Sequence, residues 1–344
     1  MTTFVLQQFG FSKDDCAIQQ YGSGLINDTW LVKKKSTDEK FILQRINSLI
    51  FKSPNDIAAN IRLVNDHLKK YHPEYLFVAP IKTIDGKELV NRGDEYFRLF
   101  PFVKDSHTID TVEKPSQAYE AAKQFGRFTK KLARLDITAL KITLPDFHNL
   151  SLRYQQFEKA LISGNKERIM QSKELITSLQ QHKNIVTEFE TAKSNFKARC
   201  THHDTKISNV LFDENGQGLC VIDLDTLMPG FFTSDVGDMM RTYLSPVSEE
   251  EKDFAKIEIR PAFYKAIVDG YTAAMGEELN DMEKKYFLFA GKYMIYMQAI
   301  RFLTDHINND IYYGSKYEGH NFVRAANQIT LLQRLVEFES VNKG

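Results

Sequence analysis

The chain has 344 residues, enough for two ordinary domains or one two-lobed unit, because single hydrophobic cores stop growing at roughly 250–300 residues. Lysine plus arginine equals aspartate plus glutamate at 45 each, so no global basic field favours nucleic acid or an anionic membrane surface, and we expect neither as a partner. The start lacks a signal-peptide pattern and no run approaches the ~20 apolar residues of a membrane span, which predicts a cytoplasmic protein.

The first hundred residues alternate β-type segments with turns. Four runs are predicted as strands: 29–35, 40–46, 77–90 and 95–103. Within the third run, Asp85-Gly86 is typical of a hairpin turn. Between the second and third runs, Ser53 can cap a helix, Pro54 suits its first position, and apolar residues recur at helical spacing up to residue 68. We therefore expect a β-rich region with one helix.

After Pro101 the pattern becomes helical. Segments 117–135 and 152–193 are amphipathic at the helical period. One β-type island interrupts the helices at 209–225, where two apolar runs are joined by a glycine turn, which predicts a hairpin. The chain is therefore predicted to be α+β, with a small β-rich N-terminal lobe (1–103) and a large, mainly helical C-terminal lobe (104–344).

Four polar residues flank the predicted hairpin. Asp204, Lys206 and Asn209 precede its first strand, and Asp223 ends its second strand. Phosphoryl transfer needs a carboxylate to orient the attacking hydroxyl, oxygen ligands for magnesium, and positive charge near the moving group. Each residue alone is more often a cap or turn former, but their joint spacing predicts Asp204 as base, Lys206 as the cation, and Asn209 and Asp223 as metal ligands.

The stretch that begins at His202 and ends with "SDVGD" resembles the aminoglycoside phosphotransferases and choline kinases, small-molecule kinases with a protein-kinase-like fold. The resemblance implies a bilobal fold, ATP and Mg²⁺ as cofactors, and the same roles for the four polar residues. His203 stands where that family has glycine in its His-Gly-Asp motif. Asp235 and Asp238 resemble the family's structural carboxylates, although helix caps are the simpler interpretation.

The same resemblance places the glycine-containing turn near residue 22 over the nucleotide phosphates. Gly22, Ser23 and Gly24 are the expected contacts, because a missing Cβ lets backbone N–H groups approach phosphate oxygens. Gln44 stands where protein kinases carry a lysine on the third strand, with Arg45 beside it on the opposite face. Either of the two could contact phosphate.

Three further positions belong to the predicted nucleotide site. Asn60 stands where the helix usually contributes a glutamate, so the usual lysine–glutamate ion pair is missing from this sequence. Phe100 and Phe102, near the predicted lobe junction, are expected to contact adenine, although Phe is more often a core residue. The missing ion pair keeps open the alternative of a pseudokinase that binds nucleotide without catalysis.

For the acceptor, two further stretches are informative: "GLINDTWLV" and "FILQRIN" within 24–47, and the segment 301–328. They are more similar to bacterial N-acetylhexosamine 1-kinases than to the other small-molecule kinases. By that resemblance, Asp28, Arg301 and Tyr312 bind the sugar through hydroxyl, ring or N-acetyl oxygens and an apolar ring face. Alternatively, Arg301 could form an ordinary helical pair with Asp305. Leu25 departs from the pattern, since those kinases often have histidine there.

The resemblance implies an ATP-dependent sugar 1-kinase that phosphorylates the anomeric hydroxyl of an N-acetylhexosamine (GlcNAc or GalNAc) or a related hexose. Kinases of another small alcohol, of the aminoglycoside, choline or homoserine type, remain an alternative, as does the pseudokinase. A protein kinase is disfavoured because no Asp-Phe-Gly or Ala-Pro-Glu motif follows Asp223. The expected partners are the sugar and ATP, and protein partners are left open.

Overall fold

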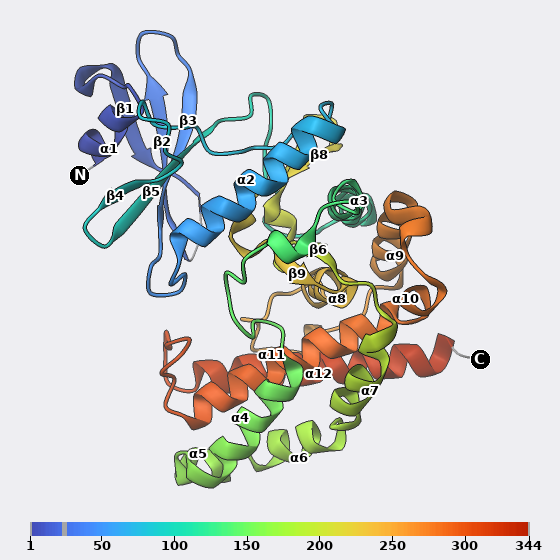
Figure 1. The fold of residues 1–344 in the computed structure, drawn as a ribbon. Coiled ribbons are helices and arrows are strands. Elements are labelled where there is room, and N and C mark those ends of the chain that lie inside the picture. The colour runs from blue at the N-terminus through green and yellow to red at the C-terminus, as the bar shows by residue number, and fades with distance from the viewer. Residues whose placement is uncertain (1, 23–25, 343–344) are drawn as a thin grey trace. The chain divides into compact units, whose positions relative to one another are not determined.

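The computed structural model describes residues 2–22 and 26–342. The chain divides into two compact units. The first unit comprises Met1–His107, Arg134–Pro145 and Leu211–Pro229, and the second comprises Thr108–Ala133, Asp146–Val210 and Gly230–Gly344. The predicted division at residue 103 differs from this one, because two later segments group with the first unit. The α+β class is confirmed, with an antiparallel sheet in the first unit and mostly helices in the second (Figure 1).

The first unit is built on a five-stranded antiparallel sheet in the order β1-β2-β3-β5-β4. Its strands are β1 (Cys16–Gln20), β2 (Asp28–Lys34), β3 (Lys40–Ile46), β4 (Val90–Arg92) and β5 (Glu95–Pro101). One face buries Val32, Leu43 and Phe97 against Leu6 of α1 (Thr2–Gln8). The predicted helix is confirmed as α2 (Pro54–Tyr71), with Pro54 in its first turn, but the Ser53 side chain does not cap it.

The turn at Asp85-Gly86 forms, but the predicted hairpin around it is wrong. Gly86 has a positive φ of 82°, and the Thr83 N–H donates to the Lys87 carbonyl over 2.8 Å. The flanking segments do not pair with each other, because both lie along the edge of β5. Ile81 bridges to Leu99, and β4 pairs with residues 95–97.

The two later segments are held to the first unit by α2. The buried Asn60 amide donates to the carbonyls of Lys141 (2.8 Å) and Leu227 (2.7 Å) and accepts from the Lys141 N–H. The predicted hairpin at 209–225 is confirmed as β7 (Val210–Phe212) and β8 (Gly218–Val221), joined at Gly216. The short strand β9 (Met228–Gly230) follows it.

The second unit is helical apart from β6 (Arg199–Thr201). Its helices are α3 (Pro115–Lys131), α4 (Leu150–Ser163), α5 (Lys166–Gln171), α6 (Lys173–Gln181), α7 (Asn184–Ala192), α8 (Phe232–Tyr243), α9 (Pro261–Met275), α10 (Asp281–Lys285), α11 (Phe287–Ile307) and α12 (His320–Asn342). The amphipathic segments are thus confirmed as α3 and as α4 to α7. Among residues 2–22 and 26–342, no helix is both long and apolar enough to cross a bilayer.

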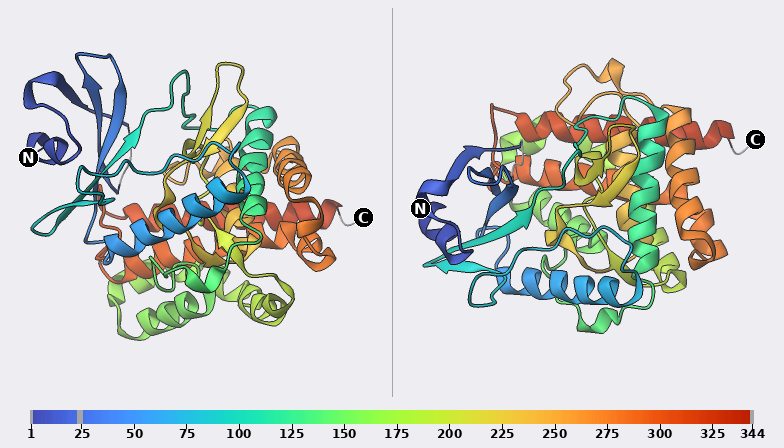
Figure 2. Two further views of the ribbon diagram at one scale, coloured as in Figure 1. Left: turned by 45° about the horizontal axis from the view of Figure 1, so that its top comes forward. Right: turned by 90° about the horizontal axis from the view of Figure 1, so that it is seen from above.

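Helix α11 is the centre of the second unit. It is buried over most of its length and contacts α4, α8 and α12, and Figure 2 shows it beside α12. Glycine allows α8 to approach it closely, because a Cβ at Gly237 would overlap the carbonyl oxygen of Ala290. A close, rigid contact of this kind fixes where α8 presents its side chains.

Candidate active site

Residues 202–209, here the Asp204 loop, follow β6 and bring together three of the predicted site residues. The Asp204 side chain is 20% exposed, and Lys206 Nζ lies 3.2 Å from its Oδ1. Asn209 Nδ2 donates to the backbone carbonyl of Asp204 over 2.9 Å. A carboxylate, an ammonium group and an amide therefore surround one point, with the amide oxygen as the remaining ligand atom of Asn209.

His203 adopts the left-handed backbone conformation, with φ of 67°. Glycine enters this region without steric cost, which explains why the resembling family has glycine here. The imidazole contacts the Thr201 hydroxyl at 3.1 Å and the His148 ring at 5.4 Å between centroids. A Cβ at Gly230 would overlap the His203 ring. The space for the larger side chain is therefore provided by a glycine elsewhere in the second unit.

Two buried carboxylates of α8 hold the backbone of the Asp204 loop. Asp235 accepts the N–H groups of His203 (2.8 Å) and His202 (3.2 Å), and Asp238 accepts the N–H of Thr205 (2.8 Å). Neither carboxylate caps its own helix, whose N-cap is residue 231. The interpretation of these residues as helix caps is therefore wrong, because their hydrogen-bond partners lie about thirty residues earlier in the chain.

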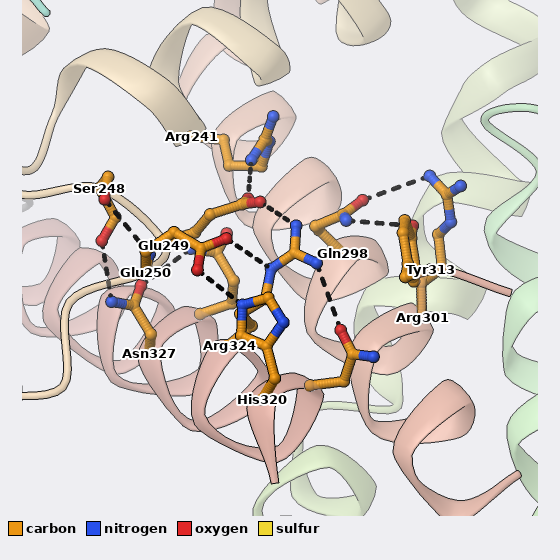
Figure 3. A network of polar contacts seen from close by, with 12 residues as sticks. Arg241, Ser248, Glu249, Glu250, Gln298, Arg301, Tyr313, His320, Arg324 and Asn327 are labelled. Carbon is orange, nitrogen blue, oxygen red and sulfur yellow. Dashed lines mark hydrogen bonds and ion pairs between the residues drawn. The ribbon is translucent and has the colours of Figure 1, made fainter. Parts of the chain in front are cut away.

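Asp238 begins an ionic network that continues through Arg241. Figure 3 shows its part from Arg241 to Glu249 and Arg324. Arg241 donates to Asp238 Oδ1 over 2.9 and 3.0 Å and to Glu249 over 2.7 Å. Glu249 also pairs with Arg324, which donates to Asn321 over 3.2 Å. The charges of these arginines are thus balanced inside the second unit, and the network stiffens the support of the Asp204 loop.

The second unit contains a cavity of about 420 Å³ lined by residues of α4, the end of α11 and the following turn. It is called the Arg301 cavity below, and its lining includes Arg153, Lys159, Arg301, Asp305, Tyr312 and Tyr313. Two of the predicted sugar-binding residues therefore line one cavity. The alternative helical pair with Asp305 is wrong, because the Asp305 carboxylate instead accepts the N–H groups of Tyr312 (2.7 Å) and Tyr313 (2.9 Å).

A series of aromatic rings joins the Arg301 cavity to the Asp204 loop. The Arg301 guanidinium lies 5.6 Å from the Phe147 ring centroid, and Phe147 stacks on His148 at 4.3 Å. His148 in turn contacts His203, the neighbour of Asp204. Burial, followed by electrostatic interaction with His203 and Arg301, lowers the pKa of His148 well below its ordinary value. This ring is therefore neutral and acts as packing between the cavity and the loop.

In the first unit, Gln44 and Arg45 point to opposite faces of the sheet, as strand alternation predicts. Arg45 donates to Asp28 Oδ2 over 2.8 Å and pairs with Glu95. These bonds, first that to Asp28, raise the pKa of Arg45. Gln44 Oε1 accepts from Arg98 Nε (3.1 Å) and Nη2 (2.9 Å).

Sequence reasoning missed Arg98. Its side chain is buried in β5, where it forms an ion pair with the equally buried Asp225 and lies 5.0 Å from the Phe100 ring. The sequence does indicate this pairing, because a single arginine in the apolar run "EYFRLFP" is costly to bury unless it has a partner. Asn27 also donates to Asp225 over 2.8 Å. Asp225 thereby ties the segment after β8 to the sheet.

Asp223, the predicted metal ligand of the first unit, lies two residues before this anchor. It is exposed and adopts a left-handed conformation with φ of 60° and ψ of 68°. Non-glycine residues in this region are uncommon and cluster at functional sites. An exposed carboxylate on a left-handed turn offers the kind of oxygen atoms that Mg²⁺ prefers as ligands.

The other predicted nucleotide contacts are only partly described. Gly22 has a positive φ of 80°, with open space where a Cβ would stand. Ser23 and Gly24 lie outside the described residues, as does Leu25. Phe102 is half-buried, with its ring 6.3 Å from the ring of Tyr21.

These features define a class of protein, the small-molecule kinases with a protein-kinase-like fold. Residues 17–280 match the phosphotransferase enzyme family known as APH, and the chain belongs to this family. It is an enzyme that transfers a phosphoryl group to an alcohol group of a small molecule.

Solved structures are similar over nearly the whole chain. A microcompartment-associated aminopropanol kinase shares 15% identity over 98% of this chain and 97% of that chain, with a TM-score of 0.64. Spectinomycin phosphotransferase, solved with ADP and spectinomycin, shares 14% identity over 94% of this chain and 93% of that chain, with a TM-score of 0.56. A choline kinase from Cryptosporidium parvum shares 13% identity over 96% of this chain and 92% of that chain, also with a TM-score of 0.56. At these identities the likeness shows the fold.

Replacement of Arg98 by leucine is expected to destabilise the protein by about 3–5 kcal/mol, because it leaves the Asp225 charge buried without a partner. The double variant with Asp225→Asn should recover part of this loss. Urea denaturation measures both effects, with the exposed Arg92→Leu of β4 as the control. Equal losses for the Arg98 and Arg92 variants would contradict the assignment.

The raised pKa of Asp235 predicts that the stability of the protein depends on pH. Burial raises the pKa of Asp235 from 3.8 to about 6, although electrostatic interaction with His202 and hydrogen bonds from the loop N–H groups oppose the rise. Its folded-state pKa is raised, so its contribution to stability is complete below pH 3.8 and is lost as the pH rises through about 6. The unfolding free energy of wild type, relative to Asp235→Asn, should fall by about 1 kcal/mol between pH 5 and 7.

This difference is measured by denaturation at the two pH values. Asp110→Asn, at an exposed position, is the matched control and should show no such change. A wild-type advantage over Asp235→Asn that is constant, or that grows with pH, would contradict the assignment.

Proposed function

We propose that the protein is an ATP- and Mg²⁺-dependent sugar 1-kinase whose acceptor is an N-acetylhexosamine or a related hexose. The observation that carries the choice of acceptor is the charge of the Arg301 cavity. Arg153, Lys159 and Arg301 line it, whereas the carboxylate of Asp305 is already bonded to two backbone N–H groups. A cationic amine, such as choline or an aminoglycoside, would be repelled there, and a polyhydroxyl ligand offers the oxygen acceptors that guanidinium groups require.

In this proposal Asp204 orients the acceptor hydroxyl and takes its proton as the oxygen–phosphorus bond forms and the bond from phosphorus to ADP breaks. Lys206 lies beside Asp204, whose charge raises the pKa of this lysine, so its ammonium group stays charged and stabilises the moving phosphoryl group. Asn209 and Asp223 would hold Mg²⁺, which neutralises nucleotide phosphate charge when bound.

Sugar recognition is assigned to Arg301, Tyr312 and Asp28. Arg301 would donate to ring or N-acetyl oxygens, and Tyr312 would offer a hydroxyl and a ring face. Asp28 uses only Oδ2 for Arg45, and its Oδ1 makes no hydrogen bond within residues 2–22 and 26–342, so it would accept from a sugar hydroxyl. Transfer to the anomeric oxygen is supported by the resemblance to N-acetylhexosamine 1-kinases.

The nucleotide is assigned to the first unit. Gly22, Ser23 and Gly24 would cover the phosphates, and Phe100 and Phe102 would contact adenine. Of the two residues left open on β3, Gln44 is assigned to the nucleotide phosphates, because the guanidinium of Arg45 on the other face is already shared by two carboxylates.

ADP release across N-acetylhexosamines, hexoses, choline, homoserine and an aminoglycoside tests the proposal. We expect turnover of a sugar and a decrease in kcat of about 10²- to 10⁴-fold in Asp204→Asn, with ATP binding retained. Glu214→Gln, an exposed change in the same region, is the control and should leave kcat unchanged.

Two outcomes would refute this proposal. Turnover of an amine together with inactivity toward every sugar would reassign the acceptor. ATP binding without turnover, unchanged by the Asp204 substitution, would favour the pseudokinase.

A further inference from the structure

The Arg301 cavity contains two guanidinium groups without an acidic partner. Arg301 donates to Gln298 Oε1 over 3.2 Å and reaches the Tyr312 hydroxyl only at 3.5 Å. Arg153 donates to Gln156 Oε1 (3.0 Å) and to the carbonyl of Asp146 (2.8 Å). Among residues 2–22 and 26–342, neither arginine forms an ion pair with a carboxylate. Both are half-buried, so water screens their charges only in part.

Four other arginines of the same unit are balanced by carboxylates. The pairs are Arg168–Asp310, Arg199–Glu283, Arg241–Asp238 and Arg324–Glu249. Figure 3 shows the contrast: Arg324 lies among carboxylates, whereas the dashed line from Arg301 leads to the neutral Gln298. Arg260, which does not line the cavity, instead donates to backbone carbonyls. The fold thus supplies countercharge to four arginines of this unit and withholds it from the two that line the cavity.

The carboxylate that lines the cavity does not supply this countercharge. Asp305 accepts from two backbone N–H groups and from Asn321 Nδ2 (3.1 Å), and its side chain is buried. The pKa of Arg153 is lowered, first by burial and then by the charge of Arg301. The second cause means that the two arginines repel each other. An unbalanced positive charge in a partly buried cavity is most simply explained by a ligand that brings the negative charge.

We propose that the acceptor sugar carries one anionic substituent, a carboxylate or a sulfate ester, which binds between Arg153 and Arg301. The inference rests on the proposed sugar kinase and narrows its substrate class. Planar guanidinium groups bind such oxyanions through paired, charge-assisted hydrogen bonds. Tyr312 and Tyr313 provide ring faces for the sugar, and the exposed Lys159 adds attraction at the rim.

Matched acceptor pairs test this proposal with ATP as donor: glucuronate against glucose, galacturonate against galactose, and N-acetylglucosamine 6-sulfate against N-acetylglucosamine. The anionic member of at least one pair should have a kcat/KM about tenfold or more above its neutral partner, mainly through KM. The uronate and sulfate pairs distinguish the two anions. Raising the ionic strength should reduce the preference.

Substitutions of the two arginines test whether they cause the preference for the anionic acceptor. Arg153→Gln and Arg301→Gln should each abolish it, whereas Arg153→Lys and Arg301→Lys should keep part of it because the charge remains. Arg334→Gln, an arginine of α12 with a 48% exposed side chain, is the control and should leave the preference unchanged. Thermal melting of each variant shows that it is folded, and the lysine variants and the salt dependence test the proposal if a glutamine variant is not.

The outcomes separate this inference from the function on which it rests. Turnover of neutral sugars that depends on Asp204, with equal or higher kcat/KM than for every anionic partner, would overturn the anionic acceptor and leave the sugar kinase standing. A preference that survives both glutamine substitutions would overturn the assigned binding site. Inactivity toward all six sugars, beside turnover of an amine, would overturn the sugar kinase itself and the inference with it.

Discussion

The site depends on one interaction: two buried carboxylates of α8 accept hydrogen bonds from backbone N–H groups of the Asp204 loop. Asp235 and Asp238 hold the backbone around His203, whose positive φ would otherwise be disfavoured. Helix α8 is itself fixed by its close contact with α11 at Gly237. The position of Asp204 is therefore set by the helical core of the second unit, which is the kind of preorganisation that catalysis requires.

The first unit uses the same principle with a different pair. Arg98 and Asp225 are buried together, so each removes the cost of the other's charge. This pair ties the segment that presents Asp223 to the sheet, and Gln44 is bonded to it from the neighbouring strand. Asp223, which is exposed and has a left-handed backbone conformation, lies two residues before the anchored Asp225.

Local patterns predicted much of the fold, and nonlocal partners explain the failures. The helix after Pro54 and the hairpin at β7 and β8 follow from period and turn residues that lie within one segment. The turn at Gly86 was equally visible, but its flanking segments pair with β5, which no local signal reports. The spacing of Asp204, Lys206 and Asn209 in the sequence also predicted that they lie together. The hydrogen-bond partners of Asp235, and the lack of a carboxylate beside Arg153, are visible only in the folded chain.

The second unit contains both a preorganised carboxylate, Asp204, and the cationic Arg301 cavity. The central claim of the proposed function is the chemistry of the product. The phosphorus NMR spectrum of the product, formed from ATP and the preferred acceptor, tests this claim most directly. The account predicts a phosphate ester on the anomeric carbon of a sugar, recognised by coupling of the phosphorus to the anomeric proton. A phosphate on a primary hydroxyl, or on an amino alcohol, would contradict it.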